Sequence, residues 1–250
     1  MATLQTEETD FTTVDGVKAA YRRFGKRSTF PLLYINHLRG LMDTLDPLLY
    51  NTIAKNRELI VYDSFGIGHS EVTVPDSTKA MASIAAKFLA AIDVSVADVI
   101  GFSMGGGVAQ ILGWDYPEVV HKLILAGTQS GIGEAVVLPP KEEDMLHLFF
   151  YPSESSRALR NKWWERIHER KVAGEVRKGY LSIFSHTVWI LPTLVTNGHD
   201  DIMSPTPNSF VLQQNIRKAQ LIIYPDAGHG HLFQVPELYA KHLELFLEDE

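Results

Sequence analysis

The segment Gly101-Phe102-Ser103-Met104-Gly105 carries the strongest indication of the fold. It fits the pattern G-x-S-x-G, follows the apolar run Val96–Ile100 and opens a segment with helical spacing, Met104–Trp114. A serine on a sharp turn between a strand and a helix is held in a strained conformation with its hydroxyl exposed. The flanking glycines remove clashes that side chains would cause there. We therefore predict that Ser103 is a nucleophile at the end of a buried strand.

A serine hydroxyl is a weak nucleophile at neutral pH and needs a base that a third group orients. When the nucleophile sits on such a turn, the acid and then the histidine follow it in the chain. Asp201 comes shortly after the run Leu194–Thr196, in the pattern G-x-x-D-x-x-x-P. His229 directly follows a glycine behind the run Leu221–Tyr224. We assign Asp201 as the acid and His229 as the base.

Neighbouring residues offer two alternatives, because Asp200 competes with Asp201 and His231 competes with His229. Together with His199, these four residues could also be grouped as ligands of a metal ion. None of them has the helical i, i+4 spacing of a zinc motif, and a metal site would leave the serine turn unexplained. We therefore expect neither a metal nor a cofactor.

The negative oxygen of an acyl-transfer transition state needs two backbone donors. The amide of Met104, the residue after the nucleophile, is expected to be one. The other is expected from the loop Asn36–Gly40, with Leu38 as the donor. Arg39 in this loop is either a substrate anchor or a residue that holds the loop together. The glycine-rich stretch Asp63–Ser70 predicts a tight turn beneath the site.

Short apolar runs alternate with amphipathic helical segments along most of the chain, after a hairpin that turns at Asp15-Gly16. This alternation predicts a doubly wound α/β fold with a parallel sheet covered on both faces, in which ligands bind at the carboxyl ends of the strands. The alternation stops over residues 131–190, which are rich in aromatic and charged side chains. We interpret residues 131–190 as a cap (lid) inserted into a single domain, 1–250.

Composition narrows the function further. The formal net charge is −7 and no dense basic block is present, so neither a nucleic acid nor an anionic membrane is an expected partner. The absence of cysteine excludes disulfides and cysteine nucleophiles. The first ten residues do not resemble a secretory signal, and no apolar run is long enough to span a membrane. We expect a cytoplasmic protein, and its oligomeric state stays open.

These motifs resemble the α/β-hydrolase superfamily, in the lid-bearing branch of serine esterases, lactonases and cofactor-free haloperoxidases. The resemblance rests on the serine turn, the loop His37–Gly40, the turn Asp63–Ser70 and the stretches Asn197–Asp201 and Gly228–Gly230. It implies an eight-stranded, mostly parallel sheet with helices on both faces and a short helical cap after the sixth strand. It also implies that Ser103, Asp201 and His229 form a catalytic triad. The chain departs from the family at Phe65, where an arginine is common, and at Leu38, where a glycine is usual.

The expected function is hydrolysis of an ester, lactone or related acyl compound through an acyl-enzyme. The aromatic cap and low charge suggest a small or medium-sized, partly apolar substrate. Two alternatives share the fold. One is a non-hydrolytic or C–C bond-cleaving catalyst that uses His229 as base. The other is a small-molecule receptor with a vestigial triad.

Overall fold

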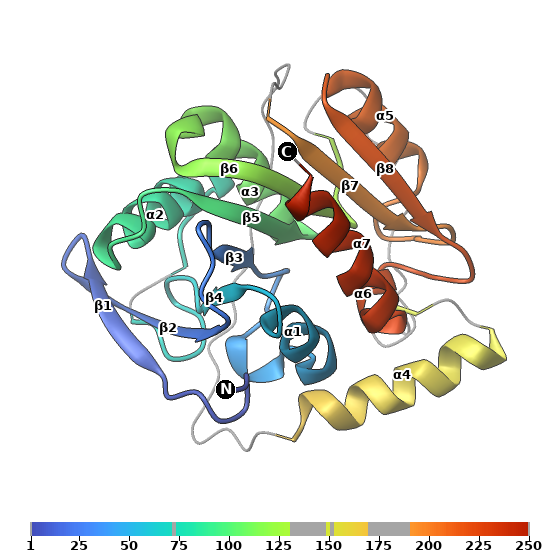
Figure 1. The fold of residues 1–250 in the computed structure, drawn as a ribbon, viewed down its shortest axis with the longest axis horizontal. Coiled ribbons are helices and arrows are strands. Elements are labelled where there is room, and N and C mark those ends of the chain that lie inside the picture. Colours follow the sequence, from blue (N-terminus) through green and yellow to red (C-terminus); the bar gives the residue numbers. More distant parts are fainter. Residues whose placement is uncertain (1, 72–73, 131–148, 151–152, 170–190, 250) are drawn as a thin grey trace.

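The computed structural model describes residues 2–71, 74–130, 149–150, 153–169 and 191–249. One sheet of eight strands runs through it, in the order β1-β2-β4-β3-β5-β6-β7-β8 (Figure 1). The strands are β1 (Asp10–Val14), β2 (Val17–Gly25), β3 (Leu32–Ile35), β4 (Glu58–Tyr62), β5 (Ala97–Phe102), β6 (Val120–Ala126), β7 (Thr193–Gly198) and β8 (Ala219–Tyr224). Strands β3 to β8 are parallel, whereas β1 and β2 are antiparallel additions at one edge. The predicted fold class is confirmed.

The N-terminal hairpin turns where the sequence indicates. Val14 pairs with Val17, and the residues between them, Asp15 and Gly16, have φ angles of 51° and 80°. Left-handed conformations at both central positions are typical of the two-residue turn that matches the twist of antiparallel strands.

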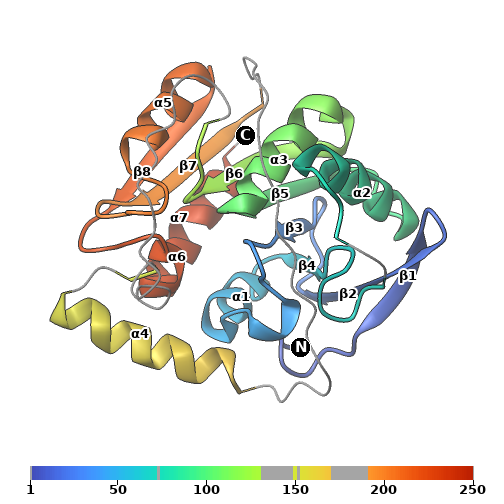
Figure 2. The same ribbon diagram turned by 180° about the vertical axis from the view of Figure 1, so that it is seen from behind.

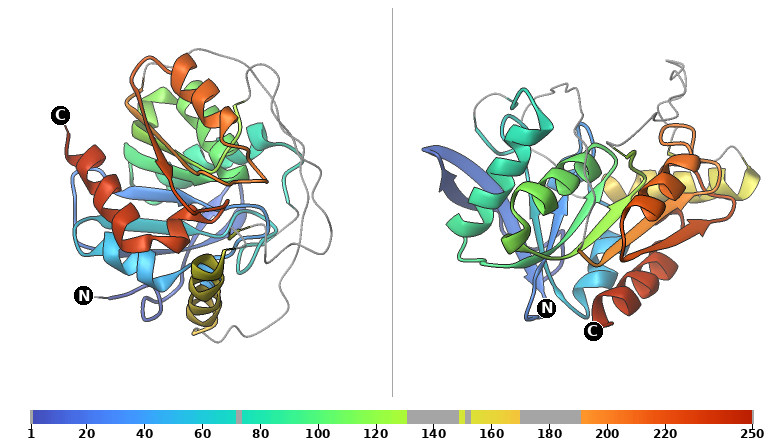
Figure 3. Two further views of the ribbon diagram at one scale, coloured as in Figure 1. Left: turned by 90° about the vertical axis from the view of Figure 1, so that its right-hand side faces the viewer. Right: turned by 90° about the horizontal axis from the view of Figure 1, so that it is seen from above.

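The helices cover both faces of the sheet (Figures 2 and 3). One face carries α1 (Pro47–Ala54), α6 (His231–Gln234) and α7 (Pro236–Glu248), and the other carries α2 (Thr78–Ala91), α3 (Met104–Asp115) and α5 (Pro207–Asn215). Strand β3 shows why two cores form. Leu32 and Tyr34 enter the core beneath α1 and α7, and Leu33 and Ile35 enter the opposite core. Because successive strand side chains alternate between faces, a wholly apolar strand serves both cores.

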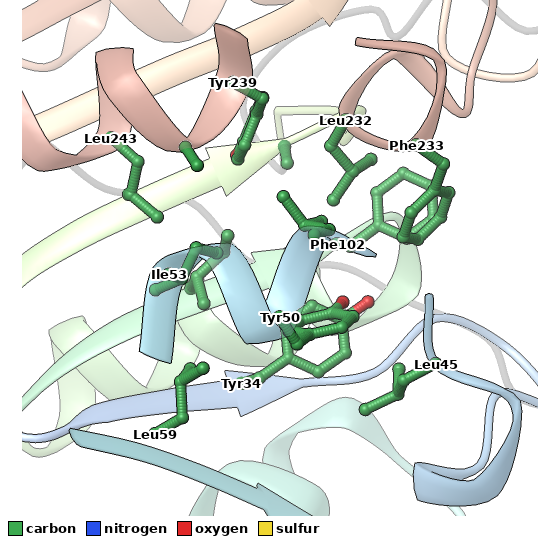
Figure 4. Close-up of a cluster of buried hydrophobic side chains, with 14 of the residues drawn as sticks. Tyr34, Leu45, Tyr50, Ile53, Leu59, Phe102, Leu232, Phe233, Tyr239 and Leu243 are labelled. Atoms are coloured by element: carbon green, nitrogen blue, oxygen red, sulfur yellow. The ribbon is translucent and has the colours of Figure 1, made fainter. Parts of the chain in front are cut away.

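The core beneath α1 and α7 is rich in aromatic rings (Figure 4). Tyr34 and Tyr50 meet edge to face with their ring centroids 4.9 Å apart. Phe102, at the end of β5, packs against Phe233 of α6 at 5.4 Å. This core therefore extends to the residue that precedes Ser103.

Helix starts follow the local chemistry. Helix α1 begins at Pro47, because Asp46 caps it by accepting a hydrogen bond from the amide of Leu48. Ser77 caps α2 in the same way through the amide of Ala80.

Only part of the predicted cap, 131–190, lies within the described residues. It comprises Phe149, Phe150 and residues 153–169, which contain α4 (Glu154–Ile167). Helix α4 lies beside α1 and α6 at the edge of the molecule (Figure 1). The side chain of Arg166 on α4 bonds both carboxylate oxygens of Asp46, with its Nε 2.7 Å from Oδ1. The rest of the predicted cap lies outside the described residues.

Candidate active site

Ser103 lies on a turn between β5 and α3 with a backbone that few residues adopt. Its φ and ψ angles are 55° and −120°. Its amide donates to the carbonyl of Ala126 on β6 at 2.9 Å, which fixes the turn to the sheet. A Cβ on Gly105 would lie 2.1 Å from the carbonyl oxygen of Ile35, so only glycine lets α3 approach β3 so closely. The strain predicted from the sequence is therefore present and is held by neighbouring backbone.

The structure brings Ser103, His229 and Asp201 together from three different loops. The Oγ of Ser103 lies 2.9 Å from Nε2 of His229, and Nδ1 of His229 lies 2.8 Å from Oδ2 of Asp201. Ser103 is 126 residues and Asp201 is 28 residues from His229 in the chain. Parallel strands align their carboxyl ends, so the loops after β5, β7 and β8 meet at one edge.

Asp201 is held in place from its other oxygen. Its Oδ1 accepts hydrogen bonds from the amides of Met203 and Ser204, both at 2.8 Å. Only 4% of Asp201 and 1% of His229 are exposed. Such a carboxylate can orient the imidazole and stabilise its charged form.

The two alternative residues occupy different surroundings. The Oδ1 of Asp200 lies 3.1 Å from Nδ1 of His199, whose side chain is exposed. His231 is fully buried, with Nδ1 3.2 Å from the carbonyl oxygen of His229 and Nε2 3.0 Å from Oγ1 of Thr196. Burial lowers the pKa of His231 to about 3, so its ring is neutral. Neither alternative contacts Ser103 among the bonds of the described residues.

The expected oxyanion donors lie on either side of the same turn. Met104 is the first residue of α3, a position whose amide has no acceptor within the helix. Leu38 lies in a turn closed by the amide of Gly40, which donates to the carbonyl of His37 at 3.0 Å. Arg39 adopts a left-handed conformation in this turn, with φ of 64°. Leu38, Arg39 and Met104 all line one cavity.

Sequence reasoning missed the ring of His37, which was considered only as part of this loop. The ring meets Phe102 and Phe149 edge to face, each with centroids 5.4 Å apart. Phe149 also meets the ring of His229 at 5.5 Å. Burial and the nearby His229 lower the pKa of His37 to about 3, so this imidazole is neutral beside His229. The sequence did not indicate this position, because it depends on the packing of the loop after β3 against the end of β5.

A second missed residue, Gln234, joins the histidine loop to α4. Its Oε1 accepts from the amide of Gly228 at 2.8 Å, and its Nε2 donates to Oγ of Ser156 at 3.0 Å. In addition, the amide of Gly230 donates to the carbonyl of Phe149 at 2.6 Å. The described part of the predicted cap is therefore bonded directly to the loop that carries His229.

The turn Asp63–Ser70 and the loop Asn36–Gly40 both contribute residues to the wall of the same cavity. Asp63 accepts from the amides of Met42 and His69, both at 2.9 Å, and burial raises its pKa. Phe65, at the position where the family commonly has arginine, is buried in the core beside α2 and α3. The apolar residue thus extends the core towards the oxyanion loop.

Among the described residues, no group of three or more acidic, histidine or cysteine side chains could hold a metal ion. None of the helices there is both long enough and apolar enough to cross a bilayer.

Known proteins of one fold family are similar to this chain. A profile of the family described as alpha/beta hydrolase fold matches residues 39–155. The chain is 30% identical over 255 residues to a poly(3-hydroxyalkanoate) depolymerase of Ectopseudomonas oleovorans, with 91% of this chain and 88% of that protein covered. It is 29% identical over 233 residues to a 2-hydroxymuconate semialdehyde hydrolase of Pseudomonas sp. (strain CF600), with 81% and 80% covered.

A solved structure is similar over the whole length. An alpha/beta hydrolase fold protein from Chitinophaga pinensis matches with a TM-score of 0.89 and 30% identity, and 100% of each chain is covered. Similarity of this extent, in both sequence and fold, identifies the family. The protein belongs to the α/β-hydrolase family.

Proposed function

We propose that this protein is a serine hydrolase that cleaves a carboxylic ester or lactone through an acyl-enzyme. The observation that carries the proposal is the continuous chain of hydrogen bonds from Ser103 through His229 to Asp201. Its order matches the requirement of a nucleophile, a base and a group that orients the base.

In the proposed mechanism, Oγ of Ser103 attacks the carbonyl carbon while Nε2 of His229 takes its proton. The carbonyl oxygen becomes negative and accepts hydrogen bonds from the amides of Leu38 and Met104. His229 then gives its proton to the leaving alkoxide, and the C–O bond breaks. Water, deprotonated by His229, releases the acyl group and restores Ser103.

The substrate class follows from the relatives and the site together. The 30% identical relative is a depolymerase of poly(3-hydroxyalkanoate), which is a polyester. The surroundings of Ser103 are apolar, with Phe102, Phe149 and an exposed Leu38 nearby. We favour esters of small, partly apolar acids over charged substrates. Arg39 lines the adjoining cavity and is proposed to contact the substrate.

A second candidate is hydrolysis of a C–C bond next to a carbonyl. The 29% identical relative, a 2-hydroxymuconate semialdehyde hydrolase, favours it. The same three residues would serve, with His229 as the proton carrier. The two activities are separated by measuring kcat/KM for a panel of esters and for a diketone whose C–C bond next to a carbonyl would be cleaved.

Treatment with a fluorophosphonate, read by intact mass, tests the nucleophile. We expect a single adduct on the wild-type protein and none on Ser103→Ala. We expect much slower labelling of His229→Ala, because the hydroxyl loses its base. Ester turnover by Ser103→Ala should fall by at least about 10⁴-fold. Folded wild-type protein that takes up no adduct, while a small inhibitor reaches the site, would contradict the acyl-enzyme mechanism.

A further inference from the structure

His231 has no part in the proposed mechanism, although it follows the proposed base by only two residues. Its side chain is fully buried. Its ring stacks on Tyr224 with the centroids 5.4 Å apart and meets the ring of Tyr239 at 5.8 Å. Burying a polar ring is costly unless its nitrogen atoms are hydrogen-bonded. The partners of these two nitrogens therefore indicate what His231 does.

Each ring nitrogen of His231 has a hydrogen-bond partner. Nδ1 lies 3.2 Å from the carbonyl oxygen of His229, and Nε2 lies 3.0 Å from Oγ1 of Thr196. A carbonyl oxygen can only accept, so Nδ1 carries the proton and donates to it. Burial lowers the pKa of His231 to about 3, so the ring is neutral and Nε2 has no proton. The hydroxyl of Thr196 therefore donates to Nε2.

These two hydrogen bonds connect the segments that carry the acid and the base. Thr196 lies on β7, which leads into the loop of Asp201, and His229 lies in the loop after β8. The ring of His231 thus joins the strand before the acid to the backbone of the base. The hydroxyl of Tyr239 on α7 lies 3.4 Å from Oγ1 of Thr196, on the side away from solvent.

The backbone around the base needs such support because of its neighbours in the chain. His229 stands between Gly228 and Gly230, and glycine leaves the backbone free to adopt many conformations. The amides of both glycines are hydrogen-bonded to other segments. The bond from His231 goes to the carbonyl of His229 itself. It therefore acts on the residue whose ring must carry the proton.

We propose that His231 is a positioning residue, which holds the backbone of His229 in the orientation that proton transfer requires; this rests on the function proposed above. Nε2 of His229 must stay within hydrogen-bond distance of Ser103 while the ring gains and loses a proton. A displacement of about 1 Å can lower a reaction rate by about 100-fold. Disturbing His231 therefore slows the chemical step and leaves substrate binding unchanged.

Thr196→Val tests the donor to Nε2, because valine has nearly the shape of threonine without its hydroxyl. We expect kcat for p-nitrophenyl acetate to fall about tenfold, with KM changed less than about twofold. Thr196→Ser keeps a hydroxyl and should retain most of the wild-type kcat. The matched control is Thr193→Val, at the other buried threonine of β7, whose Oγ1 donates to the carbonyl of Leu191 at 2.9 Å. Its kcat should stay within about twofold of the wild type.

His231→Phe keeps an aromatic ring beside Tyr224 but removes both nitrogens. We expect kcat and the rate of fluorophosphonate labelling of Ser103 to fall at least about tenfold, again with little change in KM. His242→Phe is the matched control, because Nδ1 of His242 lies 3.0 Å from the hydroxyl of the same tyrosine. It should leave kcat and the labelling rate unchanged.

Nitrogen-15 NMR of the wild-type protein tests the tautomer without an assay of activity. His231 should show a protonated Nδ1 and an unprotonated Nε2 at neutral pH. The Nε2-protonated tautomer would overturn the proposal. So would normal kcat and labelling in folded His231→Phe and Thr196→Val, an effect on KM alone, or an equal loss of kcat in Thr193→Val.

Urea titration first establishes that each variant is folded under the assay conditions. If His231→Phe does not fold, Thr196→Val and its serine counterpart decide the question. Wild-type protein that takes up no fluorophosphonate would instead contradict the proposed nucleophile, so the two failures are distinct.

Discussion

The two flanks of Ser103 are built differently. On the histidine flank, Asp201 and His229 are almost fully buried, and Gln234 and the ring of Phe149 contact the loop that carries His229. On the oxyanion flank, Leu38 is 39% exposed and lines a hollow that is partly open to solvent. Dense bonding on one flank keeps the proposed proton carrier in a single orientation. The open flank leaves room for substrate.

This contrast agrees with what acyl transfer requires. Proton transfer needs heavy atoms held within hydrogen-bond distance, so the residues that support the base gain from being rigid. Substrate binding needs an accessible surface, and the hollow next to the proposed donors, Leu38 and Met104, provides one. Four predictions test the contrast, beginning with the change that should have the largest effect.

Replacing Asp201 with asparagine should damage the histidine flank most. Asparagine keeps the shape, but it carries no charge to stabilise the imidazolium that forms on His229. We expect kcat to fall by about 10³- to 10⁴-fold, with little change in KM. Asp200→Asn is the matched control and should change kcat less than twofold. If Asp200→Asn lowered kcat as much as Asp201→Asn, Asp201 would not be the residue that orients His229.

Gly105→Ala tests how closely α3 approaches the oxyanion flank. The new Cβ would lie 2.1 Å from the carbonyl oxygen of Ile35, so the helix must move or the loop must shift. We expect a loss of at least about 3 kcal/mol in the free energy of unfolding, measured by urea titration. Gly16→Ala is the control, because nothing lies within 4 Å of its Cβ and only its φ of 80° is unfavourable. It should cost about 1–2 kcal/mol.

Gln234→Ala removes the side chain that connects the histidine loop to α4. The amide of Gly228 would lose its acceptor in a buried place, and Ser156 would lose a donor. We expect the free energy of unfolding to fall by about 2–3 kcal/mol. Fluorophosphonate labelling should also slow, because the loop that carries His229 loosens. Gln220→Ala, at an exposed glutamine on β8, is the control. An equal loss of unfolding free energy in Gln220→Ala would contradict the role given to Gln234.

The smallest expected effect concerns pH. The pKa of His231 is lowered to about 3 by burial, so the folded protein keeps this ring neutral while the unfolded chain protonates it near pH 6.5. The contribution of the neutral His231 ring to the free energy of unfolding is complete above pH 6.5 and is lost as the pH falls towards 3. Between pH 7 and pH 5 the loss should be about 2 kcal/mol.

His231→Asn should reduce the difference in unfolding free energy between pH 7 and pH 5 by about that amount. The measurement is urea titration at both pH values. His199→Asn, at a side chain that is 69% exposed, serves as the control. An unchanged pH dependence in His231→Asn would mean that the ring is already protonated in the folded protein.

Much of the fold follows from local patterns in the sequence. The hairpin turns at Asp15 and Gly16 as expected, and the apolar run Leu221–Tyr224 lies in strand β8. The bounds of the elements are less evident in the sequence, since α5 ends at Asn215 and β8 already begins at Ala219.

Patterns in the sequence predict the serine turn, the order of Ser103, Asp201 and His229, and the alternation that builds a parallel sheet. The turn and the alternation can be predicted because glycine spacing and apolar periodicity act over a few residues. The side chains that surround the site are set by tertiary packing. His37, Phe149 and Gln234 reach it from separate segments, and the cavity lies between four elements. Contacts of this kind depend on how strands align and helices pack, which no short stretch of sequence encodes.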